Sequence, residues 1–181
     1  MLADQLATRE RVWAGEPGVV FLCEHPPVIT LGRSATPANI LDAGDVPVER
    51  IERGGEVTYH GPGQLMIYPV IRVTRVVELL ARVAGAIAET CAALGAPGAA
   101  WRRDPAGVWL GERKLAACGI HVARGVSVHG FALNVDNLLD EDEPIVTGYH
   151  WGYADASGRH IRDGYYFQDP RTFRLSARFT F

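Results

Sequence analysis

Apolar residues recur at helical spacing in two parts of the chain. The first stretch runs from Leu2 to Trp13 and ends before the turn residues Gly15, Pro17 and Gly18. In the second, a single 3.6-residue stripe lasts until Gly95, and Thr74 stands where a cap of its first turn would be. The pattern predicts one helix in each stretch. The stripe consists of Val76, Leu80, Val83, Ile87, Cys91 and Leu94.

Short apolar runs between glycine and proline turns predict the strands. The first two are VVFLC at 19–23 and VITLGR, which stops at Gly32, followed by a surface loop at 34–50. Residues 57–60 and 65–73 then predict a hairpin, joined by the Gly-Pro-Gly turn at 61–63. Three more strands follow as GVWLG, KLAACGIHV and SVHGFALNV, with turns near Glu112 and Arg124-Gly125. Strands on both sides of one long helix predict an α+β fold, with a mixed β-sheet and helices packed on one face.

Composition narrows the class of protein. A chain of 181 residues with 48% hydrophobic and 22% charged residues is ordinary for one globular domain. Eighteen basic against 21 acidic residues argue against a broad nucleic-acid surface. The three cysteines have irregular spacing that suits neither a disulfide framework nor a zinc site, and this favours a reducing cytoplasm. No signal peptide and no membrane-spanning run is evident, so we expect a soluble intracellular domain.

The stretch RGGEVTYHGPGQ, from Arg53 to Gln64, combines glycines with polar side chains. It could be a bulged or bent hairpin and nothing more. Alternatively, Gly54 and Gly55 could let the backbone approach a ligand closely, because they carry no Cβ. A phosphate-binding loop fits poorly, since no GK[ST] follows and the glycines precede a strand rather than a helix.

A second group of candidate residues lies at KLAACG, which begins at Lys114, and at HGFALN, which begins at His129. Along a regular strand Lys114 would share a face with Ala116 and Cys118, and these small residues would leave room for a substrate. An exposed lysine on a strand is the simpler alternative. His129 is equally explained as a capped or hydrogen-bonded core histidine.

Together, RGGEVTYHGPGQLMIYP, the upstream EHPPVITLGR, and the downstream KLAACGI and HGFALNV resemble the lipoyl(octanoyl) transferases. This family is related in fold to lipoate and biotin protein ligases, and the resemblance runs from about Gln5 to Asn137. It implies transfer of an octanoyl group from octanoyl-acyl carrier protein to a lysine of a lipoyl domain. The acceptors would be the lipoyl domains of 2-oxoacid dehydrogenases and the glycine cleavage H protein. The resemblance implies no metal, nucleotide or other cofactor. From the charge balance and the lack of a membrane-spanning run we expect no nucleic-acid or membrane partner, and we expect a monomer.

The resemblance also implies site residues. Lys114 falls on the family's catalytic lysine, which lowers the pKa of a nucleophilic cysteine. Backbone amides near Gly119 or Gly130 would be candidates for holding the thioester oxygen as it becomes an oxyanion. The substrate-binding residues would be Arg53, Gly54, Gly55, Glu56, Val57, Thr58, Tyr59, His60, Ala117, Cys118, Gly119, Gly130, Phe131 and Ala132.

The chain departs from this family at the nucleophile and in the divergent segment 138–181. Gly148, after Thr147, occupies the position of the family cysteine, and glycine cannot act as a nucleophile. Cys118, four residues after Lys114, is a candidate substitute, although a small buried hydrophobe is the alternative role.

Three functions therefore stay open. The first is an octanoyl transferase acting through a cysteine thioester, and the second is a non-catalytic module that binds an acyl group or its carrier protein. The third is an ATP-dependent lipoate ligase. Ligases of that kind typically have an Asp after the motif histidine, so Gly61 after His60 favours the transferase over the ligase.

Overall fold

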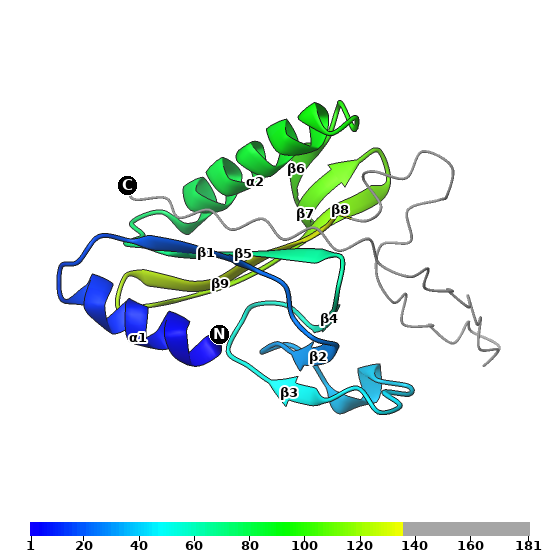
Figure 1. Ribbon diagram of the computed structural model, residues 1–181, viewed down its shortest axis with the longest axis horizontal. Coiled ribbons are helices and arrows are strands. Elements are labelled where there is room, and N and C mark those ends of the chain that lie inside the picture. Colours follow the sequence, from blue (N-terminus) through cyan, green and yellow to red (C-terminus); the bar gives the residue numbers. More distant parts are fainter. Residues whose placement is uncertain (136–181) are drawn as a thin grey trace.

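The described residues, 1–135 of the computed structural model, build a six-stranded sheet, a three-stranded sheet and two α-helices (Figure 1). Every neighbouring pair of strands in the large sheet is antiparallel. In spatial order its strands are β1 (Val19–Cys23), β5 (Gln64–Val70), β9 (Val126–Asn134), β8 (Arg113–Ala123), β7 (Ala106–Leu110) and β6 (Ala100–Arg103).

The small sheet contains the parallel pairing that makes the fold mixed. Its central strand β2 (Val28–Leu31) runs parallel to β3 (Val48–Arg50) and antiparallel to β4 (Val57–His60). A short 3₁₀ helix, η1 (Pro37–Asn39), precedes β3. The surface loop predicted for 34–50 was therefore wrong in part, because β3 has three exposed residues and no alternation that a pattern could reveal.

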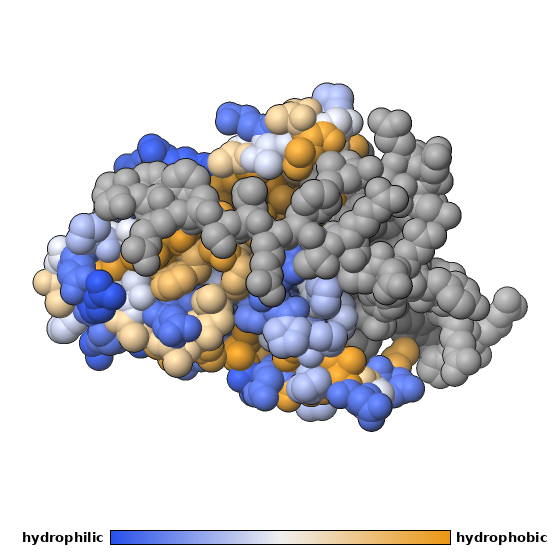
Figure 2. Space-filling model, viewed as in Figure 1, coloured by the Kyte–Doolittle hydropathy of each residue, from blue (hydrophilic) through white to orange (hydrophobic). Residues whose placement is uncertain are grey.

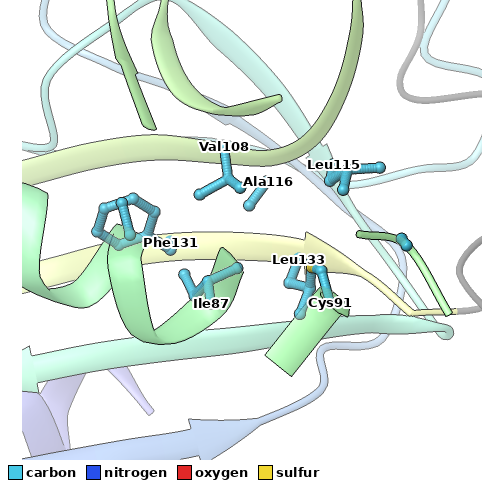
Figure 3. Packing of buried hydrophobic residues seen from close by; sticks show 9 residues of the cluster. Ile87, Cys91, Val108, Leu115, Ala116, Phe131 and Leu133 are labelled. Atoms are coloured by element: carbon cyan, nitrogen blue, oxygen red, sulfur yellow. The ribbon is translucent and has the colours of Figure 1, made fainter. Parts of the chain in front are cut away.

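Helix α2 (Val76–Ala93) packs on one face of the large sheet. Ile87 and Cys91 of this helix meet Phe131 and Leu133 of β9 in the main core cluster, where their side chains point toward one another (Figure 3). Burial of such side chains is the main favourable term that holds helix and sheet together. The predicted cap at Thr74 was wrong, since the helix begins after Arg75 and has no side-chain cap.

Helix α1 (Leu2–Trp13) has the predicted bounds but lies on the opposite face of the sheet (Figure 1). Its Val12 packs against Val70 and Val128, whereas Ile67 of β5 packs against the α2 cluster. Alternate side chains of a strand point to opposite faces. The α+β class is thus confirmed, but the two helices do not share one face, because the large sheet is buried on both sides.

The predicted hairpin of 57–60 and 65–73 was wrong. β4 pairs with β2, and β5 lies between β1 and β9 in the other sheet, so the turn at 61–63 carries the chain from one sheet to the next. The reason is burial on both faces of β5, since Met66 contributes to one apolar cluster and Ile67 packs against another. Such a strand needs partners on both edges and cover on both faces.

Candidate functional site

A cavity of about 350 Å³ lies between the large sheet, the small sheet and the first turn of α1. Met1 and Leu2 stand at its edge and are 39% and 41% exposed. Figure 2 shows hydrophobic residues at the surface between the start of α1 and the small sheet. The cavity brings together strands that are far apart in the sequence, namely β2 and β4 of the small sheet with β5, β8 and β9 of the large one.

Small residues of β8 and β9 form the sheet side of the cavity, among them Gly119 and Gly130. A Cβ on Gly130 would overlap the carbonyl oxygen of Ile67, and one on Gly119 would come within 2.8 Å of the Gly54 carbonyl oxygen. Both glycines are therefore required by neighbouring backbone. The same contact explains the glycine-rich stretch, because Gly54 also donates its N–H to the carbonyl of Ile120 at 3.1 Å. Close approach to a ligand is not needed to account for Gly54.

Arg53 is a buried cation beside the cavity, with 6% of its surface exposed. Its guanidinium donates to the Thr30 carbonyl at 2.7 Å, to Thr30 Oγ1 at 2.8 and 3.1 Å, and to the Gly54 carbonyl at 3.0 Å. No carboxylate among residues 1–135 pairs with it. Burial lowers the pKa of Arg53 to about 10, so the group stays charged at neutral pH.

His60 belongs to a chain of polar groups that joins the two sheets. Its Nδ1 lies 2.7 Å from Oε1 of Gln64, and Gln64 donates its Nε2 to Asn134 Oδ1 at 3.0 Å. The proton of neutral His60 is therefore on Nδ1, and Nε2 faces Thr30 Oγ1 at 3.3 Å. Burial lowers the pKa of His60 to about 4, which keeps the ring neutral.

Two cavity residues that the sequence reasoning missed form a second polar pair. The ring nitrogen Nε2 of His25 lies 2.9 Å from the Tyr68 hydroxyl. Burial lowers the pKa of His25 and raises that of Tyr68, so both stay neutral near pH 7. Both residues stand inside the motifs EHPPVITLGR and RGGEVTYHGPGQLMIYP, and alternation along β5 could have signalled that Met66 and Tyr68 share a face.

Lys114, the one lysine of the chain, is not among the residues that line the cavity. A bulge at Leu115 breaks the alternation of β8, because Trp109 pairs with Lys114 and Val108 with Ala116. The Lys114 stem consequently passes over Gly107, where a Cβ would come within 3.1 Å of its Cε. Its ammonium lies 5.0 Å from the centre of the Trp109 ring, a cation–π contact, and burial lowers the pKa of Lys114.

The bulge also corrects the predicted relation between Lys114 and Cys118. The Lys114 side chain passes over Gly107, and Gly107 pairs with Ala117 of the cavity lining, so Lys114 lies on the cavity face of the sheet. Cys118 instead pairs with Phe131 and packs against the α2 cluster. Burial raises the pKa of Cys118 to about 12, outweighing the opposite effect of Lys114. A protonated thiol is a poor nucleophile. These contacts suit a small buried hydrophobe better than a nucleophile.

Nine of the predicted binding residues line the one cavity, although they come from three separate stretches of sequence. Those that line it are Arg53, Thr58, His60, Ala117, Cys118, Gly119, Gly130, Phe131 and Ala132. Those that do not line it are Gly54, Gly55, Glu56, Val57 and Tyr59. Thr147, Gly148 and the divergent segment 138–181 lie outside the described residues.

Neutral buried histidines make stability depend on pH. The pKa of His60 and of His129 is lowered from 6.5 to about 4 in the fold, mainly by burial. Between these values the unfolded chain binds protons that the folded chain does not. The contribution of the two histidines to the free energy of unfolding is therefore fully present above pH 6.5 and is lost as the pH drops towards 4. We expect a loss of up to about 3 kcal/mol per histidine. Urea unfolding at pH 7, 6 and 5 measures this before the carboxylates titrate, and equal stabilities at pH 7 and 5 would contradict it.

Within residues 1–135, no helix is long and apolar enough to cross a membrane, and no three His, Cys, Asp or Glu side chains gather as metal ligands.

Comparison with known proteins agrees with this architecture. A bi-partite lipoate protein ligase from Thermoplasma acidophilum shares the fold, with a TM-score of 0.55 and 17% identity over 75% of this chain and 60% of that one. An octanoyltransferase of Shewanella sp. (strain W3-18-1) is 44% identical over 66% of this chain and 57% of its own length. An octanoyltransferase of Gloeobacter violaceus is 44% identical over 81% of this chain and 65% of its own.

The chain thus spans between about half and two thirds of the length of these relatives. The profile of the lipoyl protein ligase A/B catalytic domain matches residues 1–150, which is most of the sequence. The chain therefore belongs to the lipoyl protein ligase A/B catalytic domain family.

Proposed function

We propose that this chain is an octanoyltransferase domain, which takes an octanoyl group from octanoyl-acyl carrier protein and passes it to a lysine of a lipoyl domain. One observation supports this most: three motif segments that are remote in sequence, at 53–60, 117–119 and 130–132, contribute to a single cavity. Relatives that match 66% and 81% of the chain are named octanoyltransferases. The acceptors would be 2-oxoacid dehydrogenase lipoyl domains and the glycine cleavage H protein, with the enzyme acting as a monomer in the cytoplasm.

The cavity has both kinds of lining that an acyl thioester needs. Met66, Val28 and Ala132 supply apolar lining, and each buried CH₂ of an eight-carbon chain contributes about 0.8 kcal/mol. Among its polar groups, Arg53 keeps a positive charge while His25 and His60 remain neutral hydrogen-bonding groups. Lys114 would act from beyond the lining residues, where its ammonium favours a thiolate in a nearby nucleophile.

The reaction exchanges one acyl bond for another. In a chain with a cysteine at position 148, the cysteine thiolate attacks the thioester carbonyl, the carbon–sulfur bond to the carrier breaks, and the carrier leaves as a thiolate. The acceptor lysine, once deprotonated, then attacks the acyl-enzyme, forming an amide and releasing the enzyme's thiolate. Because Gly148 stands at the expected position of the cysteine, the wild-type chain would lack the first nucleophile and would transfer slowly by direct attack of the acceptor amine.

This proposal is tested by assaying wild type beside Gly148→Cys with octanoyl-acyl carrier protein and a lipoyl domain. We expect octanoylation of the lipoyl-domain lysine by both, faster by about 100-fold or more with Gly148→Cys because a covalent route becomes available. Mass spectrometry of the enzyme should find an octanoyl thioester in the variant alone. Gly148→Ser serves as the control for steric effects, since a hydroxyl is far less nucleophilic at neutral pH.

Other outcomes would assign the other functions. Octanoate bound by a folded protein, with no transfer by either chain, would indicate a non-catalytic acyl-binding module. Acyl transfer that requires ATP and forms an acyl-adenylate would indicate a lipoate ligase instead.

A further inference from the structure

His129 has a backbone conformation that is unusual for its place in the fold. It lies inside β9, paired with Ile120, yet its φ is +63°. Residues other than glycine rarely adopt this left-handed backbone conformation, because their Cβ then comes too close to the neighbouring carbonyl oxygen. Such residues cluster at functional sites, where the surrounding structure maintains the strain. β8 pairs with β9 on both sides of His129, whereas β5 pairs with β9 only from Phe131 to Asn134, so the distortion lies where β9 has a partner strand on one edge alone.

The left-handed conformation changes where the side chain goes. Regular alternation along β9 would place His129 on the same face as Phe131 and Leu133, which pack against α2. His129 nevertheless lines the cavity, together with Gly130 and Ala132 of the other face and with Phe131. Besides the larger effect of burial on its pKa, His129 lies close enough to Arg53 and His60 of the cavity, and to His121 outside the lining, for their charges to lower that pKa further. The local distortion therefore turns an imidazole from the core face toward the cavity, as bulges near active sites do.

Gln5 of α1 holds this distortion in place. Its side chain is 2% exposed, and its Oε1 accepts the backbone N–H of His129 at 2.7 Å. A backbone N–H in the middle of a strand ordinarily bonds to a neighbouring strand, and one buried without a partner is costly. A buried polar side chain of helix α1 thus satisfies the backbone N–H of His129.

The imidazole of His129 is buried but makes no hydrogen bond to any residue from 1 to 135. It is 5% exposed, and no group of residues 1–135 pairs with either ring nitrogen. Every fully buried side-chain nitrogen or oxygen in this part of the chain has a partner, so the unpartnered ring nitrogens of His129 are not fully enclosed. The other cavity groups differ, since Arg53 and His60 both bond to Thr30, and His25 bonds to Tyr68.

We propose that His129 is a substrate-contacting residue whose neutral imidazole donates an N–H hydrogen bond to the carbonyl oxygen of the bound acyl thioester. This inference rests on the proposed function, because it takes the acyl thioester as the ligand. A hydrogen-bond donor at that oxygen stabilises the negative charge that develops there during acyl transfer. Gln5 is the positioning residue, because its hydrogen bond to the His129 backbone keeps the ring in the cavity.

The test uses two unreactive probes that differ only at the reacting group. The first probe, the ketone, is octanoyl-pantetheine with a methylene in place of the sulfur, so it keeps the carbonyl group. The second probe, the thioether, is S-octyl-pantetheine, which has no carbonyl group. The variant is His129→Asn, because asparagine tolerates the left-handed backbone but removes the ring. Arg124→Asn is the matched control, since Arg124 is the other non-glycine residue with positive φ in residues 1–135, at +51°, and lies outside the cavity lining.

Calorimetry with wild type should show tighter binding of the ketone than of the thioether. His129→Asn should weaken ketone binding by about 10-fold, the effect of one hydrogen bond, and leave thioether binding unchanged. Its stability in urea should be equal to or higher than that of wild type, because strain is relieved. Arg124→Asn should bind both probes as wild type does.

Equal ketone affinity in wild type and a folded His129→Asn would overturn the inference while leaving the proposed function intact. A similar loss for both probes would also overturn it, since the ring would then support only the cavity's structure. Failure of wild type to bind either probe would reject the proposed function and this inference with it. Should His129→Asn not fold, the ¹⁵N shifts of the His129 ring in wild type must move with the ketone and not with the thioether.

Discussion

Replacing Gly130 with alanine should destabilise the protein by about 3 kcal/mol, whereas the same replacement at Gly85 should stabilise it by about 1 kcal/mol. A Cβ on Gly130 would overlap the Ile67 carbonyl oxygen and come within 2.8 Å of Pro69 Cδ, so β5 and β9 would have to separate. Gly85 lies in helix α2, and a methyl group added there would meet no other atom within 4 Å, so alanine reduces only the entropy of the unfolded chain.

Urea unfolding at pH 7.5, monitored by tryptophan fluorescence and circular dichroism, would measure both free energies. The pH is chosen above 6.5, where the histidine contribution is complete. Both substitutions replace glycine with alanine. Changes of opposite sign in the free energy of unfolding would therefore reflect the two sites and not the chemical change itself. A Gly130→Ala protein as stable as wild type would mean that β5 and β9 leave room for a Cβ beside the Ile67 carbonyl oxygen.

Truncating Phe131 to alanine should cost about 3–5 kcal/mol, the range for removing a buried aromatic side chain. Phe131 is 1% exposed and is the largest of the fully buried side chains in residues 1–135. It makes an edge-on contact with Trp101, with ring centres 6.2 Å apart, and packs with Ile87 of α2 (Figure 3). Its removal leaves a void that the strands on either side cannot fill by collapse.

Phe131 also lies beside the cavity, so this substitution connects stability with binding. We expect Phe131→Leu, which keeps most of the volume, to lose about 1 kcal/mol and to retain acyl binding. Denaturant titration of the three proteins, with octanoyl-ligand calorimetry on those that fold, gives both quantities. A loss below about 1 kcal/mol for Phe131→Ala would show that α2 does not depend on this contact.

The helices and most strands could be predicted because their signals are local. Helix α1 has the predicted bounds, and β7, β8 and β9 fall on the predicted runs. The turn at Arg124-Gly125 is also confirmed, with φ values of +51° and +71° that suit a tight hairpin turn. β6 was not predicted, because AWRR has neither a long apolar run nor a clear alternation.

For the site, the motif residues that were chosen from the sequence do meet in space, but the selection was incomplete. His25, Tyr68 and His129 were either unassigned or explained as core, because a single histidine or tyrosine in a strand has no local signature of the cavity it faces. Lys114 and Cys118 were placed on one face by regular alternation. The bulge at Leu115 separates them, and a bulge of that kind depends on the partner strand rather than on the sequence around it.

From the order of residues alone one could read the α+β class, the long helix and the family motifs, since each depends on neighbours within a few positions of the chain. Which sheet β4 and β5 join, which face α1 covers, and the turning of His129 into the cavity depend on contacts between distant segments. Those contacts are selected by burial of both faces of the large sheet and by the need of each buried N–H for a partner. For that reason Gln5, 124 residues before His129, takes part in shaping the cavity.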